Sequence, residues 1–150
     1  MAETGLSSTP MGASGWSYFT PYEDDVEDAL RRLRNRVFDG AFPKGSPERP
    51  KSIAAYVKSC GEDGTHSILD ILRADTMFAT GEMDDFATAF PPFREEAAEL
   101  FRSKKPTRED IRRAIAQLMK LRPRWQATWV VVHDAKGRPV EYVFTGFSGD

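Results

Sequence analysis

Cysteine and long apolar runs are the two features that the sequence most clearly lacks. Cys60 is the only cysteine among the 150 residues, which excludes an intramolecular disulfide and a zinc site built on cysteines. No apolar stretch approaches the roughly 18 residues needed to cross a bilayer, and residues 1–15 have neither the basic start nor the apolar centre of a secretory signal. We therefore expect a cytoplasmic protein without a membrane partner.

Two common phosphate and nucleophile motifs are also missing. Gly61 and Gly64 lack the Lys-Ser/Thr pair of a P-loop and the third glycine of a dinucleotide fingerprint. Ser148 lies close to Gly146 and Gly149, but no helix follows it, so it does not form a nucleophile elbow. The sequence predicts no bound cofactor.

The size and composition that remain are those of one globular domain. A chain of 150 residues with 40% hydrophobic residues can bury roughly two-thirds of its unfolded surface. Residues 1–14 are mostly Gly, Ser, Thr, Ala and Met, which cannot offset the entropy lost on ordering. We expect a flexible N-terminal arm over residues 1–14 and a single domain over residues 15–150.

Helix-start signals followed by apolar residues at helical spacing recur along the chain. Thr20 and Glu23 have capping-box spacing, with Pro21 at the first helical position. Thr107 and Asp110 repeat that spacing near the C-terminus. Four helices are predicted, over residues 20–40, 51–60, 93–102 and 107–121.

Strand signals lie at both ends of the chain. Residues 16–19 gather aromatic side chains, and residues 125–133 and 140–147 flank a short turn, which predicts a β-hairpin. Residues 67–72 fit a helix or a strand, and we favour a strand because the run is short. The predicted architecture is α+β: a small antiparallel sheet, formed by the N-terminal strand and the C-terminal β-hairpin, with about four helices packed on one face.

The densest group of reactive side chains lies between residues 60 and 70. His66 with Asp63 or Asp70 could supply a base, and Cys60 a nucleophile, because a thiol needs a neighbouring imidazole to ionise near neutral pH. Cys60 ends a predicted helix, however, where the helix dipole opposes ionisation. An inert, buried Cys60 is therefore the favoured interpretation.

His66 and His133 are the only histidines of the chain. With Asp134 and one of the acids near His66, they could form a metal site of two histidines and one carboxylate if the fold brought them together. No pair has the close helical spacing of a known metal motif. No metal site is predicted.

The net charge of −2 conceals two blocks of opposite sign. Residues 62–99 hold ten acidic and two basic residues, whereas residues 102–124 hold nine basic and two acidic residues. These blocks could bind charged partners, or they could face each other within the fold. Acids at positions 23–28 followed by arginines at 31–36 fit the dipole of one helix better than a nucleic-acid contact.

Three blocks of the sequence resemble a family of small bacterial proteins. These blocks are residues 15–22 (GWSYFTPY), 64–71 (GTHSILDI) and 144–150 (FTGFSGD). The resemblance brings no established activity with it. It implies only that the three blocks meet at one end of the fold.

The favoured function is a protein-binding module of the immunity or accessory regulatory type, because charge blocks and aromatic residues occur without an assembled catalytic set. Its expected contact residues are Trp16, Tyr18, Tyr22, Arg108, Arg112 and Arg113. One alternative is a small hydrolase or transferase that uses His66 with Asp63 or Asp70. A second alternative is nucleic-acid binding through the basic segment 102–124.

Overall fold

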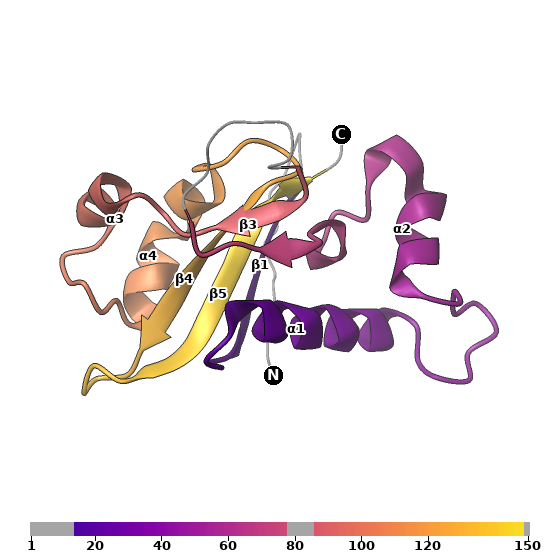
Figure 1. The fold of residues 1–150 in the computed structure, drawn as a ribbon, viewed down its shortest axis with the longest axis horizontal. Helices are drawn as coiled ribbons and strands as arrows, with labels where there is room; N and C mark the ends of the chain where they lie inside the picture. Colours follow the sequence, from indigo (N-terminus) through magenta and orange to yellow (C-terminus); the bar gives the residue numbers. More distant parts are fainter. Residues whose placement is uncertain (1–13, 78–85, 149–150) are drawn as a thin grey trace.

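A five-stranded mixed sheet organises the chain, in the order β1-β5-β4-β3-β2 (Figure 1). The computed structural model describes residues 14–77 and 86–148, so the predicted arm lies outside the described residues except for Ser14. β1 pairs with β5 and β5 with β4 in antiparallel fashion, whereas β4, β3 and β2 run parallel. The strands are β1 (Ser14–Pro21), β2 (Arg73–Ala74), β3 (Thr88–Phe90), β4 (Ala127–His133) and β5 (Pro139–Ser148).

The α+β class is confirmed, but the prediction of a small, purely antiparallel sheet is wrong. The N-terminal strand and the C-terminal hairpin form as predicted, with β1 paired to β5 from Ser14↔Ser148 to Pro21↔Glu141. β2 and β3 extend this unit, and they are too short to show an alternating pattern. Parallel pairing of β3 with β4 requires a long crossover. The segment with α3 (Arg94–Leu100) and α4 (Arg108–Met119) provides it.

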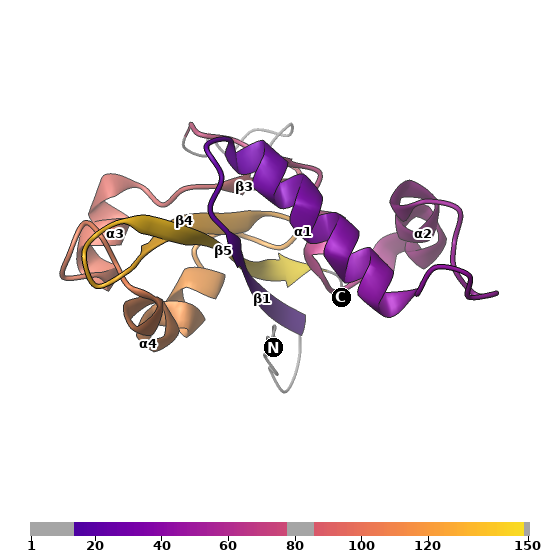
Figure 2. The ribbon, with the colours of Figure 1, turned by 90° about the horizontal axis from the view of Figure 1, so that it is seen from below.

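Helices cover both faces of the sheet, which corrects the prediction that they pack on one face. α1 (Val26–Ala41) lies over one face, with α2 (Ile53–Cys60) near its C-terminal end, and α4 lies over the other (Figure 2). Tyr142 and Phe144 of β5 belong to the core on the α1 side, whereas Val143 between them belongs to the core on the α4 side. Alternate side chains of a strand point to opposite faces, so an apolar run such as this one needs cover on both.

α1 begins later than the sequence predicts. Its N-cap is Asp25, whose side chain accepts a hydrogen bond from the Glu27 N–H at 3.0 Å. Thr20, the predicted cap, is buried in β1, where its hydroxyl accepts a hydrogen bond from Arg36. Pairing with β5 continues to the end of β1 and carries the chain past Thr20 in an extended conformation.

Residues 67–72 do not form the favoured strand. Ser67 caps a short 3-10 turn, η2 (Ile68–Asp70), by accepting a hydrogen bond from the Leu69 N–H at 3.1 Å. Ile68, Leu69 and Ile71 are buried in a compact turn between α1 and the sheet, whereas Leu72 is exposed. A second 3-10 turn, η1 (Gly61–Asp63), directly follows α2.

The remaining helices lie within two residues of their predicted ends. Ser52 caps α2, and Thr107 and Asp110 form the predicted capping box of α4, with bonds of 2.9 and 3.2 Å between side chains and backbone N–H groups. No helix among residues 14–77 and 86–148 is long and apolar enough to cross a membrane.

Candidate binding site at one end of the sheet

Three non-glycine residues with left-handed backbone conformations lie at the end of the sheet where β2, β3 and β4 begin. They are His66 (φ 56°), Ala87 (φ 56°) and Trp125 (φ 73°), and the rest of the described chain has no others. The Ala87 N–H donates to the Trp125 carbonyl at 2.8 Å, and the Ala87 carbonyl accepts from the Leu72 N–H at 2.7 Å. Such conformations cost of order 1–3 kcal/mol each and concentrate at functional sites. The three strained residues therefore mark this end of the sheet as a candidate site.

Gly64 brings the loop that precedes η2 against the Trp125 indole. Its φ is +74°, and a Cβ built on it would lie 2.6 Å from Cη2 of Trp125 and 3.1 Å from Oδ2 of Asp70. Both the backbone conformation and the close approach require glycine here.

The buried Asp70 carboxylate fixes the backbone of the same loop through hydrogen bonds. Asp70 is 4% exposed, and its carboxylate accepts hydrogen bonds from the N–H groups of Thr65 (2.9 Å) and His66 (3.1 Å). The Arg34 guanidinium donates to the Leu69 carbonyl at 2.8 Å. Burial lowers the pKa of Arg34, and the Asp70 carboxylate counteracts that effect. The loop is thus fixed by a buried acid whose charge is partly balanced by a nearby arginine.

A pocket with a volume of about 470 Å³ opens between this loop and the start of β4. The Phe86 ring is 58% exposed and lies 5.7 Å from the Trp125 ring, centroid to centroid. This cavity is called the Trp125 pocket below. The described residues that line it include two acids and no base: Val57, Gly61, Glu62, Gly64, Asp70, Phe86 and Trp125.

Exposed apolar side chains gather around the same end of the sheet. Leu72 (60% exposed) and Phe86 (58%) lie just before β2 and β3, whereas Met77 (68%) lies beyond the C-terminal end of β2. The fourth large apolar side chain that is exposed among the described residues, Val140 (41%), lies at the opposite end of β5. Grouped apolar exposure of this kind marks interaction surfaces.

The candidate catalytic residues do not form a catalytic set. Within the described ranges, no hydrogen bond joins the His66 imidazole to a carboxylate or to Cys60, and its Nδ1 is buried without a partner. The half-buried Cys60 contacts Tyr56, whose pKa is raised by burial and by this thiol. Asp63 is exposed at the end of η1. A nucleophile paired with a base is therefore not assembled at this site.

His66 and His133 do not share a site. His133 ends β4, where its Nδ1 lies 3.3 Å from the Pro106 carbonyl, whereas the loop of His66 lies beside Trp125 before β4 begins. The length of β4 separates the two ends by about 20 Å. The part of the chain that is described contains no group of three or more His, Cys, Asp or Glu residues that could hold a metal ion.

The aromatic residues expected to bind a partner have structural contacts instead. Trp16 is 3% exposed in the core. Burial raises the pKa of Tyr18, whose hydroxyl bonds with Ser67 and the backbone of Ile68. Tyr22 stacks on Tyr142 at 5.1 Å. The contact of Tyr18 with Ser67 and the pairing of β1 with β5 bring the sequence blocks 15–22, 64–71 and 144–148 together.

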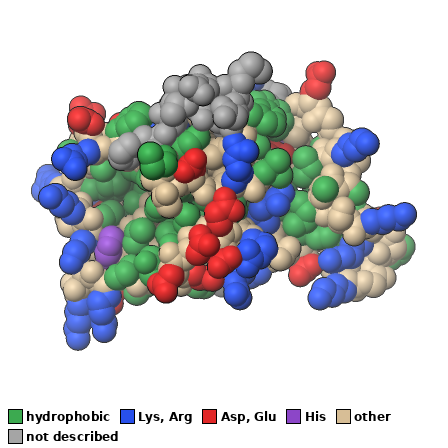
Figure 3. Space-filling model, in the orientation of Figure 1, with side chains coloured by type: hydrophobic (Ala, Val, Ile, Leu, Met, Phe, Trp, Pro, Cys, Tyr) green, Lys and Arg blue, Asp and Glu red, His purple; other side chains and the backbone are tan. Residues whose placement is uncertain are grey.

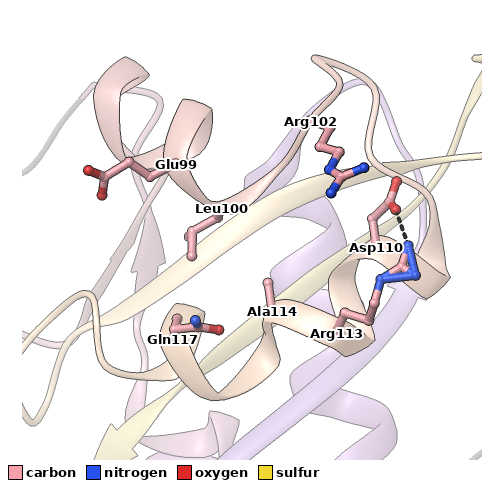
Figure 4. Close-up of a pocket in the computed structure, with 7 residues that line it drawn as sticks. All are labelled: Glu99, Leu100, Arg102, Asp110, Arg113, Ala114 and Gln117. Carbon is pink, nitrogen blue, oxygen red and sulfur yellow. Dashed lines mark hydrogen bonds and ion pairs between the residues drawn. The ribbon is translucent and has the colours of Figure 1, made fainter.

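The arginines expected to bind a partner differ in their availability. Arg108 bonds to both carboxylate oxygens of Glu141 (3.1 and 2.9 Å) and lies over the Phe19 ring at 4.0 Å. Arg113 bonds to Asp110 at 2.8 Å, and Arg112 is exposed. Arg113 lines a pocket of about 480 Å³ between α3 and α4, where Glu99 and Asp110 accompany Arg102 and Arg113 (Figure 4). This pocket has no dominant charge.

Among the described residues, one ion pair joins the two charge blocks. Arg122, from the basic block, is 7% exposed and bonds to both oxygens of Glu96 at 2.8 and 3.1 Å. Elsewhere the charges separate in space. Acidic side chains gather over the start of α1, and basic side chains lie along the edge formed by the α3–α4 connection and the β4–β5 turn (Figure 3).

Sequence reasoning missed Leu72, Phe86 and Trp125 as site residues. An apolar residue that is exposed looks the same in a sequence as one that is buried. Gly64 and Asp70 lie in the block 64–71, but the close approach of Gly64 to Trp125 joins residues that are distant in sequence.

The fold and the site together define a small α+β protein with an aromatic pocket lined by carboxylates. Comparison with known proteins adds no relative: no family model matches the chain, and no curated protein or solved structure matches it.

Proposed function

We propose that this protein is a protein-binding module, of the kind that neutralises or regulates another protein, and that its contact surface surrounds the Trp125 pocket. The observation that carries the proposal is the exposure of Leu72 and Phe86 where β2 and β3 begin, with the Leu72 N–H bonded to the carbonyl of Ala87, the residue after Phe86. Interface centres are enriched in aromatic residues and methionine, and strained loops on a rigid sheet suit recognition.

The surrounding charge supports a basic partner. Glu62, Asp63 and Asp75 are exposed near this surface, as are Arg73 and Arg124, but the only charged residues among the described lining of the pocket are the acids Glu62 and Asp70. Complementary charge accelerates association and selects among partners. Raising the salt concentration should therefore weaken the binding.

The two alternatives have less support. The enzymatic alternative lacks an assembled pair of nucleophile and base around His66. The nucleic-acid alternative relies on a segment in which Arg108, Arg113 and Arg122 are already bonded to carboxylates of the same chain. Phosphate binding would have to break those ion pairs or use the other bases.

Capture of a partner by surface variants tests the proposal. The tagged full chain is incubated with extracts of the source cell at low and high salt, beside the double variant Leu72→Ser/Phe86→Ser and the control Val140→Ser. We expect a partner that is retained at low salt by the wild type and the control but lost by the double variant. No retained partner, or equal retention by all three proteins, would contradict the proposal.

A further inference from the structure

We infer that the Trp125 pocket receives an arginine side chain of the partner protein. This inference rests on the proposed protein-binding function and identifies the chemistry that one site on that surface recognises. The occupant follows from three properties of the described lining: apolar walls, the exposed Glu62 carboxylate, and the exposed Phe86 ring beside Trp125.

The walls fit the stem of a long side chain. Val57 of α2 faces the pocket together with Phe86 and Trp125, so most of the lining is apolar. Arginine and lysine both bury an aliphatic stem against apolar surface while their charged ends reach polar groups. A short polar side chain would leave these walls in contact with water.

The charge of the lining selects a cation. Among the described residues that line the pocket, Glu62 and Asp70 are acidic and none is basic. Arg34 balances part of the charge of Asp70, whereas Glu62 is exposed and has no ion pair within the described ranges. Glu62 therefore supplies the net negative charge available to a ligand.

The aromatic rings favour arginine over lysine. The Phe86 ring is 58% exposed beside Trp125. A planar guanidinium stacks on an aromatic face while its N–H groups bond to a carboxylate in the same plane, which an ammonium cannot do. An arginine can thus use Phe86 or Trp125 and Glu62 at the same time.

The pocket is also formed in advance. Gly64, Asp70 and Trp125 hold one another through close packing and through the hydrogen bonds from Thr65 and His66 to Asp70. A site that does not have to be ordered on binding loses less affinity to conformational entropy.

Titration with short peptides tests the inference on the full chain. The ¹⁵N-labelled protein is titrated with acetyl-Gly-Arg-Gly-amide, and matched peptides carry lysine or norleucine in place of arginine. We expect saturable shifts at the Gly64 amide and the Trp125 indole, with a Kd of roughly millimolar size for a single side chain. The Trp129 indole, which donates to the Asp75 carbonyl at 2.9 Å, serves as the internal reference and should shift much less.

Two variants distinguish binding in the pocket from a general electrostatic attraction to the acidic surface. Glu62→Gln should raise the Kd of the arginine peptide by about two- to fivefold, as expected for an exposed ion pair. Asp63→Asn removes an adjacent exposed acid that does not line the pocket, and it should leave the Kd within error.

Four outcomes would overturn the inference. Norleucine binding as tightly as arginine would show a purely apolar site, and equal binding of lysine would remove the preference for a guanidinium. Equal effects of Glu62→Gln and Asp63→Asn, or no saturable shift at all, would assign any attraction to the surface as a whole. If partner capture still depends on Leu72 and Phe86, the proposed function stands while this inference fails.

Discussion

Gly64 links backbone conformation to the shape of the pocket at the scale of a single residue. Gly61 and Gly64 both have positive φ (66° and 74°) and extended ψ (−144° and −177°), a combination that side chains rarely allow. They differ in their surroundings, because a Cβ at Gly61 would meet nothing within 4 Å whereas one at Gly64 would meet Trp125. Substitutions at these two glycines therefore separate the free-energy cost of the backbone conformation from that of the steric contact with Trp125.

Gly64→Ala should therefore destabilise the protein more than Gly61→Ala. We expect Gly61→Ala to lower the free energy of unfolding by about 1–3 kcal/mol through backbone strain. Gly64→Ala should cost about 1–3 kcal/mol more, because the methyl group overpacks the site against the indole. Urea unfolding of both variants and the wild type measures the difference. Equal losses would mean that the loop and Trp125 are not in contact in solution.

The candidate site could be predicted only in part from single residues. Asp70 and His66 stood out as chemically distinctive neighbours in sequence, whereas Gly64 drew attention only as a glycine without the rest of a phosphate-binding motif. The structure places all three in or beside the loop at the pocket. The role of Asp70 differs from the predicted one, since its carboxylate bonds to backbone N–H groups rather than to the His66 imidazole. Hydrogen bonds to the backbone leave no compositional signal in a sequence.

At the scale of elements, one ion pair joins the acidic and basic blocks. Glu96 of α3 holds Arg122, which follows α4 and also lies over the Phe93 ring at 4.9 Å. Burial acts to raise the pKa of Glu96, but the hydrogen bonds and charge of Arg122 and the Phe93 N–H together lower it below 4.5. The carboxylate is thus stabilised in its charged form by the fold.

Glu96→Gln should make the stability of the protein less dependent on acidic pH. Because the folded-state pKa is lowered, the stabilisation is present above pH 4.5 and is lost as the pH falls through the lowered value. The variant should lose about 1–3 kcal/mol near pH 7, since Arg122 loses its charged partner. Urea unfolding between about pH 3 and pH 7 measures this. Glu95→Gln changes an exposed acid one residue earlier, and it should leave the dependence of the unfolding free energy on pH as in the wild type. If Glu96→Gln also kept the wild-type pH dependence, Glu96 would not be the group whose lowered pKa stabilises the fold.

Elements were predictable where their signals are local. The capping box of α4 and the turn of the β4–β5 hairpin lie within a few residues, and both elements form as predicted. The start of α1 was not predictable, because pairing with β5 extends β1 beyond the false cap at Thr20. The formation of β2 also depends on residues that are distant in sequence. Its Ala74 N–H donates to the side chain of Glu27 in α1 at 2.9 Å, and this bond covers the outer edge of the sheet.

For the whole molecule, the sheet couples the two cores into one unit. Phe144 and Val143 of β5 are both fully buried, and they pack on opposite faces among residues from α1 and α4 respectively. If either core unfolded, one face of β5 would be exposed, and the other core also needs β5 in place. This arrangement favours cooperative unfolding of the two cores.

Matched truncations in the two cores test that coupling. Leu30 on the α1 side and Leu118 on the α4 side are each at most 2% exposed, so each change to Ala should lower the free energy of unfolding by about 2–5 kcal/mol. Trp16 lies in the core on the α1 side, Trp129 packs against that core, and Trp125 lies against Gly64 in the loop before η2. Tryptophan fluorescence therefore reports mainly on that side, whereas far-UV circular dichroism reports on all helices and strands. If the cores unfold together, Leu118→Ala must shift the fluorescence and circular dichroism transitions by the same amount, as Leu30→Ala does. A fluorescence transition left in place by Leu118→Ala would divide the chain into two units, because the α1 side would then persist without its opposite face.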